Sequence, residues 1–486
     1  MHFDAVQRIF GVLLMLFSVT MLPPALISLI AADGALIPFL IGFGVILGIG
    51  LVLWLPVHNT KRELRTRDGF FIVSMFWVVL SLAGALPLAL SEDPHLPIVD
   101  AVFESVSGLT TTGATVIVGI DELPLSIRYY RQQLQWLGGM GIIVLAVAIL
   151  PMLGIGGMQL YRAEMPGPVK DKLTPRIAET AKALWYIYLG LTVLCAIAYW
   201  IAGMSAFDAI AHSFSTVSTA GFSTYDASIG HFDSPLIEMI AAAFMLAGGV
   251  NFSLHFMAFR RGTIRPYLED PEWRFYVGVV ATVVGATALA LVIQGSGYAS
   301  QLGVAEALRH GVFQVISFMT TSGFTTAQYT EWPTFVPVLL IFLSFLGGCA
   351  SSTSGGIKNI RFLLLFKQGS REIMRLIHPQ ATIPIKVGER PVHERVIDSV
   401  WGFFATYMAV FAVIMLSLMA MGLDQVTAFS AVAATLNNLG PGLGEVASNF
   451  ATVPDTPKWL LSLAMIMGRL EIFTLLVLMT PAFWRR

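Results

Sequence analysis

The chain has 486 residues, of which 56% are hydrophobic and only 12% are charged, and its formal net charge is −1. A soluble domain carries about twice that share of charged residues, which keep its surface hydrated. The composition therefore predicts a membrane protein, and the absence of a basic excess argues against a nucleic-acid partner. Cys195 and Cys349 both lie in apolar stretches, so neither a disulfide framework nor a cysteine metal site is expected.

Apolar residues form about ten blocks that are long enough to cross about 30 Å of hydrocarbon as helices. The blocks lie near residues 8–31, 36–56, 70–91, 130–152, 182–203, 236–259, 275–295, 334–366, 397–421 and 458–482. The first block is too long for a signal peptide and has no clean cleavage site, so we interpret it as a spanning helix.

Four shorter segments do not fit this scheme. They lie near residues 97–112, 206–220, 304–322 and 424–439, and each ends in a loop that contains glycine. Their length of about 15 residues suits a half-helix that enters the membrane and returns on the same side. We therefore expect an all-α membrane protein with about ten transmembrane helices and four re-entrant pore half-helices.

Basic residues predict the orientation of the chain. Most of the 29 lysines and arginines lie at the termini or in the linkers 57–69, 153–182, 260–274 and 361–396. Basic loops remain in the cytoplasm, so both termini are predicted to be cytoplasmic. The opposite side contains Arg128, Arg131, Arg309 and Lys458, together with Asp226, Asp233, Glu331 and Glu445. Its acidic residues would concentrate cations.

The loops after the four short segments resemble one another. They read TTTGAT at 110–115, STAGFS at 218–223, TTSGFT at 320–325 and NNLGPG at 437–442. The central glycines are Gly113, Gly221, Gly323 and Gly440, which recur every 102 to 117 residues. Such a period indicates a duplicated transmembrane unit. The predicted parts are a helix pair at 1–69 and four span–pore–span repeats around one pore, at 70–160, 161–262, 263–380 and 381–486.

The similarity extends outward in register. Six residues before each glycine stand Ser107, Ser215, Ser317 and Ala434. Farther along the chain come the pairs Gly138 and Gly139, Gly248 and Gly249, Gly347 and Gly348, and Gly468 and Arg469.

Four such loops can form a selectivity filter. A dehydrated monovalent cation needs a cage of oxygens in place of its hydration shell, and converging backbone carbonyls supply one. Glycine permits the required backbone angles, and the C-terminal ends of half-helices direct negative dipoles at the cation. One Thr-Gly or Ser-Gly pair alone would indicate close helix packing. Four pairs in matched positions favour a filter.

The span at 334–366 contains an interruption at residues 347–356, GGCASSTSGG, with four glycines and four hydroxyl residues in ten positions. This composition disfavours a continuous helix, and exposed backbone in hydrocarbon is costly, so the segment must face protein or water. We interpret it as a gate below the third loop; a hinge or packing surface is the alternative. The expected gate residues are Gly347, Gly348, Cys349, Ala350, Ser351, Ser352, Thr353, Ser354, Gly355, Gly356, Lys358 and Arg469. Lys358 faces either the aqueous path or the cytoplasmic interface.

Arg469 stands where the other repeats have glycine, in the middle of a span. An arginine at that depth costs about 2.5–3.5 kcal/mol, so it should face a cavity or a partner. We expect it to face the pore; a structural ion pair with Glu471 is the alternative. Glu104, His212 and Gln314, at matching positions of the half-helices, are expected to form hydrogen bonds in the scaffold.

These motifs resemble the Trk/Ktr/HKT superfamily of cation transporters, over essentially the whole chain. The resemblance implies potassium as the substrate, a homodimer, a cytosolic nucleotide-binding subunit of the TrkA type and no cofactor in this chain. It assigns the filter carbonyls to Thr111, Thr112, Thr219, Ala220, Thr321, Ser322, Asn438 and Leu439. The fourth loop departs in composition, so its coordination is the least defined.

Two other functional classes compete with a pore. Broken helices and repeats also occur in alternating-access, cation-coupled carriers, but these usually have two related halves. A membrane-embedded enzyme would need a nucleophile with its base or a set of metal ligands, whereas His212, His255 and His310 are scattered singly. We therefore expect a potassium pore and no enzymatic activity.

Overall fold

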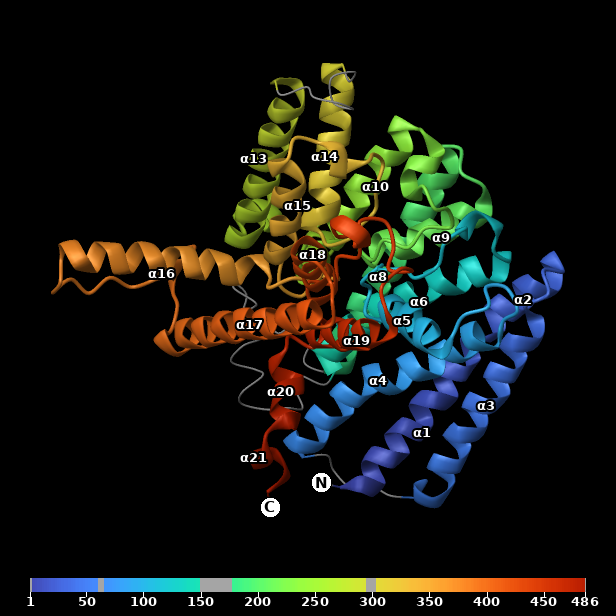
Figure 1. Cartoon of the computed structure of the whole chain (residues 1–486). Helices are drawn as coiled ribbons and strands as arrows, with labels where there is room; N and C mark the ends of the chain where they lie inside the picture. The colour runs from blue at the N-terminus through green and yellow to red at the C-terminus, as the bar shows by residue number, and fades with distance from the viewer. Residues whose placement is uncertain (1, 60–64, 149–176, 294–302, 486) are drawn as a thin grey trace.

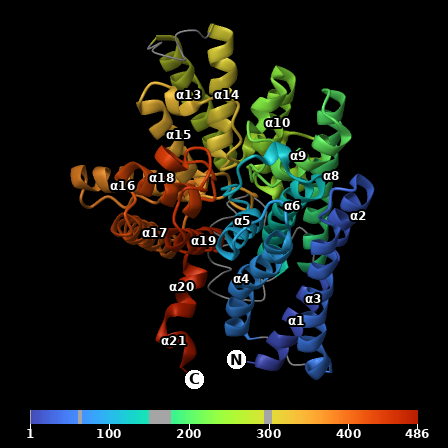
Figure 2. The same cartoon turned by 45° about the vertical axis from the view of Figure 1, so that its right-hand side comes forward.

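The computed structural model describes residues 2–59, 65–148, 177–293 and 303–485, most of them in helices. The two termini lie at the same end of the molecule (Figure 1, Figure 2). The N-terminal part consists of α1 (Phe3–Val19), α2 (Leu22–Ala31) and α3 (Leu36–Trp54). The expected boundary at residues 160/161 and the residues Lys170 and Lys172 of a predicted basic linker lie outside the described residues.

The rest of the chain contains four short buried helices between longer ones. The first group has α4 (Thr66–Leu90), α5 (Ile98–Leu109) and α6 (Leu125–Ala148), and the second has α8 (Ile177–Ile201), α9 (Ala206–Val217), α10 (Pro235–Gly248), α11 (Phe252–Arg261) and α12 (Arg265–Glu269). The third has α13 (Pro271–Ile293), α14 (Val304–Met319), α15 (Phe335–Leu346) and α16 (Asn359–Ile377). The fourth has α17 (Glu394–Ala420), α18 (Gln425–Leu436), α19 (Asp455–Arg469), α20 (Phe473–Met479) and α21 (Pro481–Trp484).

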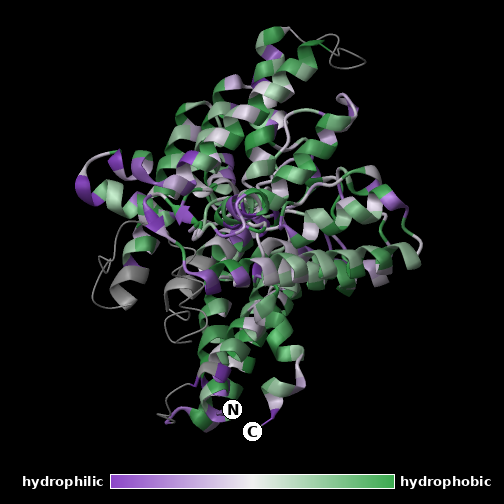
Figure 3. Ribbon diagram, turned by 90° about the vertical axis from the view of Figure 1, so that its left-hand side faces the viewer, coloured by the Kyte–Doolittle hydropathy of each residue, from purple (hydrophilic) through white to green (hydrophobic). Residues whose placement is uncertain are grey.

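The described residues form two strands, β1 (Lys386–Val387) and β2 (Arg390–Pro391), which pair antiparallel with Lys386 opposite Pro391. This hairpin is the one departure from the expected all-α fold in the described part of the chain. The long helices are mostly hydrophobic along their length (Figure 3).

The expected number of ten spans is too high for the described residues. Six helices are long and apolar enough to cross a membrane, or up to eight if each of two bent pairs is one span. Of the other two predicted spans, the one at 130–152 runs into residues that are not described. The one at 334–366 ends as α15 at Leu346, and the chain becomes helical again only in α16.

Two predicted spans are bent sharply. Helices α10 and α11 meet at 97°, and α19 and α20 meet at 115°. At the first bend Gly249 ends α10, and the side chain of Asn251 accepts a hydrogen bond from the amide of Ser253 at 2.9 Å to start α11. At the second bend Glu471 and Ile472 have left-handed φ angles of 54° and 53°. Such caps satisfy the backbone groups that a break in a helix releases.

The short helices α5, α9, α14 and α18 coincide with the four predicted short segments. Most of their residues are buried. Each packs against other helices of its own group: α5 on α4 and α6, α9 on α8, α14 on α13 and α15, and α18 on α17 and α19. The longer helices therefore hold the loops at the ends of the short ones deep inside the protein.

Helices α1 and α3 cross at two facing glycines. A Cβ added to Gly50 would lie 2.9 Å from the carbonyl oxygen of Gly11, and one added to Gly11 would lie 2.9 Å from that of Gly50. Small residues allow two membrane helices this close approach, which gains van der Waals contact where hydrophobic driving force is weak.

We expect Gly50→Ala to separate the N-terminal helix pair, because the added methyl group has no room. The cost should be about 1–3 kcal/mol, measured as a lower melting temperature of the detergent-solubilised protein. Gly48→Ala is the matched control on the same helix, since a Cβ there meets nothing within 4 Å. Equal melting temperatures for the two variants would contradict this view of the contact.

Candidate functional site

The four short helices end in the same backbone motif. After each helix, the second residue has a left-handed φ between 51° and 54°; these residues are Thr111, Thr219, Thr321 and Asn438. The backbone amide of the third residue after the helix donates a hydrogen bond to the carbonyl of the residue five positions before it. The four bonds are Thr112 to Ser107 at 2.9 Å, Ala220 to Ser215 at 2.9 Å, Ser322 to Ser317 at 2.8 Å and Leu439 to Ala434 at 2.8 Å. This is a Schellman cap, which usually places glycine at the left-handed position.

The use of threonine at three of these four positions stores backbone strain. A left-handed conformation is costly for a β-branched residue, and such strain is concentrated at functional sites. The next residue but one is the glycine of the loop, whose φ is 79° in Gly113, 80° in Gly221, 75° in Gly323 and 100° in Gly440. Residues other than glycine rarely adopt these backbone angles.

The four loops meet in a closed ring. A Cβ added to Gly113 would collide with the carbonyl oxygen of Ala220, and one added to Gly221 with that of Ser322. In the same way Gly323 abuts the carbonyl of Leu439, and Gly440 abuts that of Thr112. The order of contact is therefore first loop to second, second to third, third to fourth and fourth to first. We call residues 110–113, 218–221, 320–323 and 437–440 the four ring loops.

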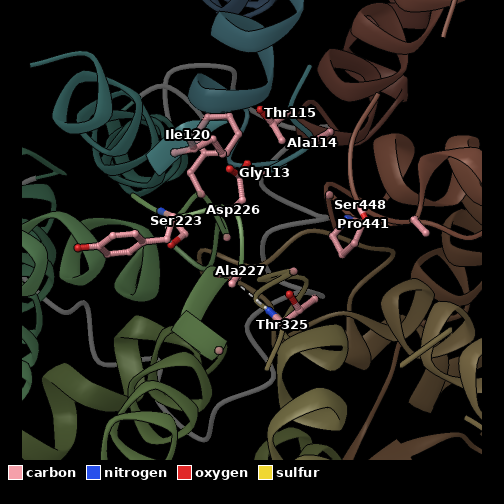
Figure 4. A pocket seen from close by; sticks show the side chains of 18 of the residues that line it. Gly113, Ala114, Thr115, Ile120, Ser223, Asp226, Ala227, Thr325, Pro441 and Ser448 are labelled. Carbon is pink, nitrogen blue, oxygen red and sulfur yellow. Dashed lines mark hydrogen bonds between the residues drawn. The ribbon is translucent and has the colours of Figure 1, made fainter. Parts of the chain in front are cut away.

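A cavity of about 710 Å³ opens on one side of the ring. All four central glycines line it, together with residues that follow them, such as Ala114, Ser223, Thr325 and Pro441 (Figure 4). Asp226 also lines the cavity, as one of the acidic residues expected at the outer mouth.

The interrupting segment, residues 347–356, lies against the residues that precede the ring glycines. The hydroxyl of Thr219 donates to that of Thr353 at 3.1 Å, and the amide of Gly355 donates to the hydroxyl of Thr321 at 2.6 Å. The amide of Gly356 donates to the carbonyl of Asn437 at 3.0 Å. Because the cavity is lined by the ring glycines and by residues after them, the ring lies between the cavity and this segment.

The segment is buried and non-helical, and its backbone groups find partners on neighbouring elements. The amide of Cys349 donates to the carbonyl of Gly249 at 2.8 Å, and that of Ala350 donates to the carboxylate of Glu272 at 2.7 Å. The Nδ2 atom of Asn359 donates to the carbonyl of Gly347 at 2.8 Å. These bonds replace some of the backbone hydrogen bonds that a helix would form, so the segment does not expose polar backbone groups to lipid.

Both basic residues that were assigned to the gate contact this segment. The ammonium group of Lys358 donates to the carbonyls of Ser352, at 3.4 Å, and Ser354. The Nη1 atom of Arg469 donates to the carbonyl of Thr353 at 2.9 Å, while its Nε and Nη2 atoms have no hydrogen-bond partner in the described part of the chain. Glu471, the acid of the alternative ion pair, pairs with Arg361 at 2.6 Å.

The polar residues of the short helices support the ring loops from behind, as expected. Glu104 accepts from the amide of Val116 at 3.0 Å, and the ring of His212 lies 2.9 Å from the hydroxyl of Ser223. The side chain of Gln314 donates to the carbonyl of Ala327 at 3.2 Å. Each bond ties a short helix to the chain that leaves its own loop.

Sequence reasoning missed the role of several basic and amide residues. Arg131, Arg309 and Lys458 were read as charges on the outer side, but each pairs with an acid: with Glu104 at 2.8 Å, with Glu238, and with Asp100 at 2.6 Å. Gln135, on α6, contacts the second ring loop. The position of Gln135 within a predicted span indicates that it has a partner, because a polar residue within an apolar membrane helix costs free energy unless it has one.

No group of three or more histidine, cysteine or acidic residues capable of holding a metal ion occurs in the described residues. The four ring loops bring backbone carbonyl oxygens together at one end of the cavity. Such a ring suits a dehydrated monovalent cation.

Comparison with known proteins agrees with this chemistry. The family model "TrkH: Cation transport protein" matches residues 37–486. The chain is 58% identical over 488 residues to the Trk system potassium uptake protein TrkH of Vibrio parahaemolyticus, with 100% of both chains covered. It is 44% identical over 488 residues to the Trk system potassium uptake protein TrkG of Escherichia coli, with 100% of this chain and 99% of the relative covered.

The crystal structure of the potassium transporter TrkH from Vibrio parahaemolyticus superposes with a TM-score of 0.92 at 55% identity, covering 100% of each chain. The match extends over the ring loops, the interrupting segment and the N-terminal helices alike. The chain therefore belongs to the TrkH family of cation transport proteins.

Proposed function

We propose that this protein takes up potassium across the bacterial inner membrane through a pore whose selectivity filter is the ring of four loops. The observation that supports this proposal is the closed order of contact, in which each ring glycine lies against a carbonyl oxygen of the next loop. One ring in one chain defines one axis. The relatives are named as potassium uptake proteins of Trk systems, which supports the choice of ion.

The filter ligands in this proposal are the backbone carbonyls just before the ring glycines. Their residues, Thr111 and Thr112, Thr219 and Ala220, Thr321 and Ser322, and Asn438 and Leu439, are almost completely shielded from solvent. A ring held by fixed backbone can replace the hydration shell of an ion without first reorganising. Short helices that re-enter the membrane would add their negative C-terminal dipoles at the same point. We assign one short helix and its flanking spans to each of four repeats, after an N-terminal pair.

We expect Gly113→Ser to lower the discrimination of potassium from sodium. The new Cβ would collide with the carbonyl of Ala220, and serine at a φ of 79° is strained, so both loops must shift. The measurement is potassium and sodium flux into liposomes that contain the purified protein, with a fall in the flux ratio of roughly tenfold, equivalent to about 1.4 kcal/mol.

Gly119→Ala is the matched control for that experiment. Gly119 has a similar φ of 77°, but a Cβ there meets nothing within 4 Å. The control should keep the wild-type ratio. A Gly113→Ser protein that keeps it as well would show that the ring is not the filter.

The interrupting segment is proposed as the gate. Its contacts with three of the four ring loops support a position across the ion path on the inner side, and glycine and serine bury too little apolar area to hold it firmly. Arg469 adds a positive charge against the same segment. A cytosolic partner would open the path by favouring a withdrawn conformation, which needs a population shift of only a few kcal/mol.

We expect deletion of residues 350–354 to give potassium flux that does not depend on the partner. Arg469→Ala should raise flux more mildly, because it removes one charge and one bond to Thr353 and leaves the segment in place. Flux into liposomes, with and without the partner, is the measurement. Cys349 provides an internal probe, since its side chain is 0% exposed in this structure and small thiol reagents should reach it only when the segment moves.

A deletion protein that still requires the partner, together with a Cys349 that stays inert under every condition, would show that the segment only fills space. The control for reagent access is Cys195, which is also buried, in α8. It should remain unmodified throughout.

We further propose that the protein works as a homodimer with a cytosolic nucleotide-binding subunit of the TrkA type. The relatives are named as parts of a Trk system, which supports a partner. Helix α16 projects from the body of the molecule, as Figure 1 shows, and it continues into the hairpin of β1 and β2. Both elements lie in the long basic segment 361–396, which is predicted to be cytoplasmic. Contact with anionic lipid is the other use of such a segment.

Charge reversal at Arg375 and Lys386 should weaken co-purification with the partner subunit. Arg371, in the same basic segment, is a poor choice because its side chain is 4% exposed and pairs with Glu394 at 2.7 Å. The side chain of Arg375 is 42% exposed. Glu445→Lys, on the predicted outer side, is the control. If complex formation is intact in the doubly reversed protein, the docking site lies elsewhere.

A further inference from the structure

One polar cluster behind the ring is used neither by the ring contacts nor by the interrupting segment. It consists of Glu104 on α5 and of Arg131 and Gln135 on α6, and all three side chains are 0% exposed. Burying an ion pair and an amide costs free energy unless all of their polar atoms are engaged. Their partners therefore show what the cluster does.

The acidic member holds the chain that leaves the first ring loop. The carboxylate of Glu104 accepts from the hydroxyl of Thr115 at 3.0 Å and from the amide of Val116 at 3.0 Å. Both bonds fix the position of the chain two and three residues after Gly113. The second charge, on Arg131, approaches the same carboxylate with Nε at 2.8 Å.

The guanidinium group of Arg131 joins the chain that leaves the first ring loop to the chain that leaves the second. Its Nη2 donates to the hydroxyl of Thr115 at 3.1 Å, and its Nη1 donates to the carbonyl of Ser223 at 3.1 Å. Its central carbon also lies 4.3 Å from the ring centroid of Phe222. The planar fork of arginine allows these contacts at once, which the single ammonium group of lysine does not.

The amide of Gln135 brackets the glycine of the second ring loop. Its Nε2 donates to the carbonyl of Ala220 at 2.7 Å, and its Oε1 accepts from the amide of Phe222 at 3.0 Å. Gly221 lies between these two residues. The carbonyl of Ala220 is also the one against which Gly113 is fitted, so Gln135 holds an atom that both loops depend on.

The cluster occurs on one side of the ring only. When the four groups are aligned on Gly139, Gly249, Gly348 and Arg469, the position of Arg131 is taken by Ala241, Leu340 and Leu461, and that of Gln135 by Met245, Ser344 and Met465. The nearly fourfold backbone is thus supported by different side chains on its different sides, with the arginine and glutamine of this cluster lying between the first and second loops.

We infer that Glu104, Arg131 and Gln135 are positioning residues that set the spacing between the first and second ring loops and thereby the discrimination of potassium from sodium. The inference rests on the proposed function. Loss of this bracing leaves the ring loops in contact but free to shift, so a smaller ion is no longer excluded by the spacing of the carbonyls. The predicted effect is on selectivity, with total flux retained.

The test uses Gln135→Leu and the double variant Glu104→Gln with Arg131→Gln. The first removes both amide bonds at nearly constant volume, and the second keeps polar groups but leaves no unpaired charge. Potassium and sodium flux would be measured in liposomes with equal amounts of folded protein. Each variant should lower the potassium-to-sodium ratio by roughly tenfold, the factor for one lost hydrogen bond to a charged or fixed group.

Asp100→Asn is the matched control, because Asp100 forms another largely buried pair on α5, with Lys458 at 2.6 Å, on a helix that also holds Glu104. It should lower the melting temperature and leave the flux ratio unchanged. An unchanged ratio in Gln135→Leu and in the double variant would overturn the inference while the proposed function stood. A wild-type protein without selective potassium flux would instead remove both.

Discussion

The contact between each ring glycine and a carbonyl oxygen of the next loop constrains the whole structure. It occurs four times and closes on itself, so no loop can move without displacing the carbonyl against which its neighbour is fitted. It also requires left-handed backbone at the glycine and two residues before it. The Schellman caps of α5, α9, α14 and α18 provide that geometry. Packing of the surrounding helices stabilises the strained backbone.

Convergence of four loops inside an apolar protein buries many polar groups, which must be paired where water and lipid cannot help. The chain meets this requirement differently at each loop. A carboxylate and a guanidinium brace the first, and the ring of His212 with Ser223 supports the second. In the fourth group the hydroxyl of Ser430 accepts from the amide of Leu443 at 2.9 Å. Similar backbones therefore rest on unequal supports, so the four sides of the ring need not respond equally to a change.

The need to pair buried polar groups also explains how the interrupting segment is held. A helix at 347–356 would satisfy its own backbone, but the observed segment is satisfied by Gly249, Glu272 and Asn437 on other elements. Bonds between elements can be exchanged without unfolding either of them, whereas bonds within a helix cannot. The side chain of Arg469 bonds to the segment through one nitrogen only, with two others unpaired among the described residues, so this contact is also open to exchange.

Sequence alone determined the membrane class, the four short helices and the four matched glycines, because hydrophobic block length and residue period are local properties of the chain. It also placed Glu104, His212 and Gln314 in the scaffold. It did not determine that Arg131, Arg309 and Lys458 are paired with acids, nor that Gln135 brackets Gly221, because those partners lie on other helices. The sharp bends at Gly249 and Ile472, which reduced the expected number of straight spans, likewise depend on caps and contacts that exist only once the helices have assembled.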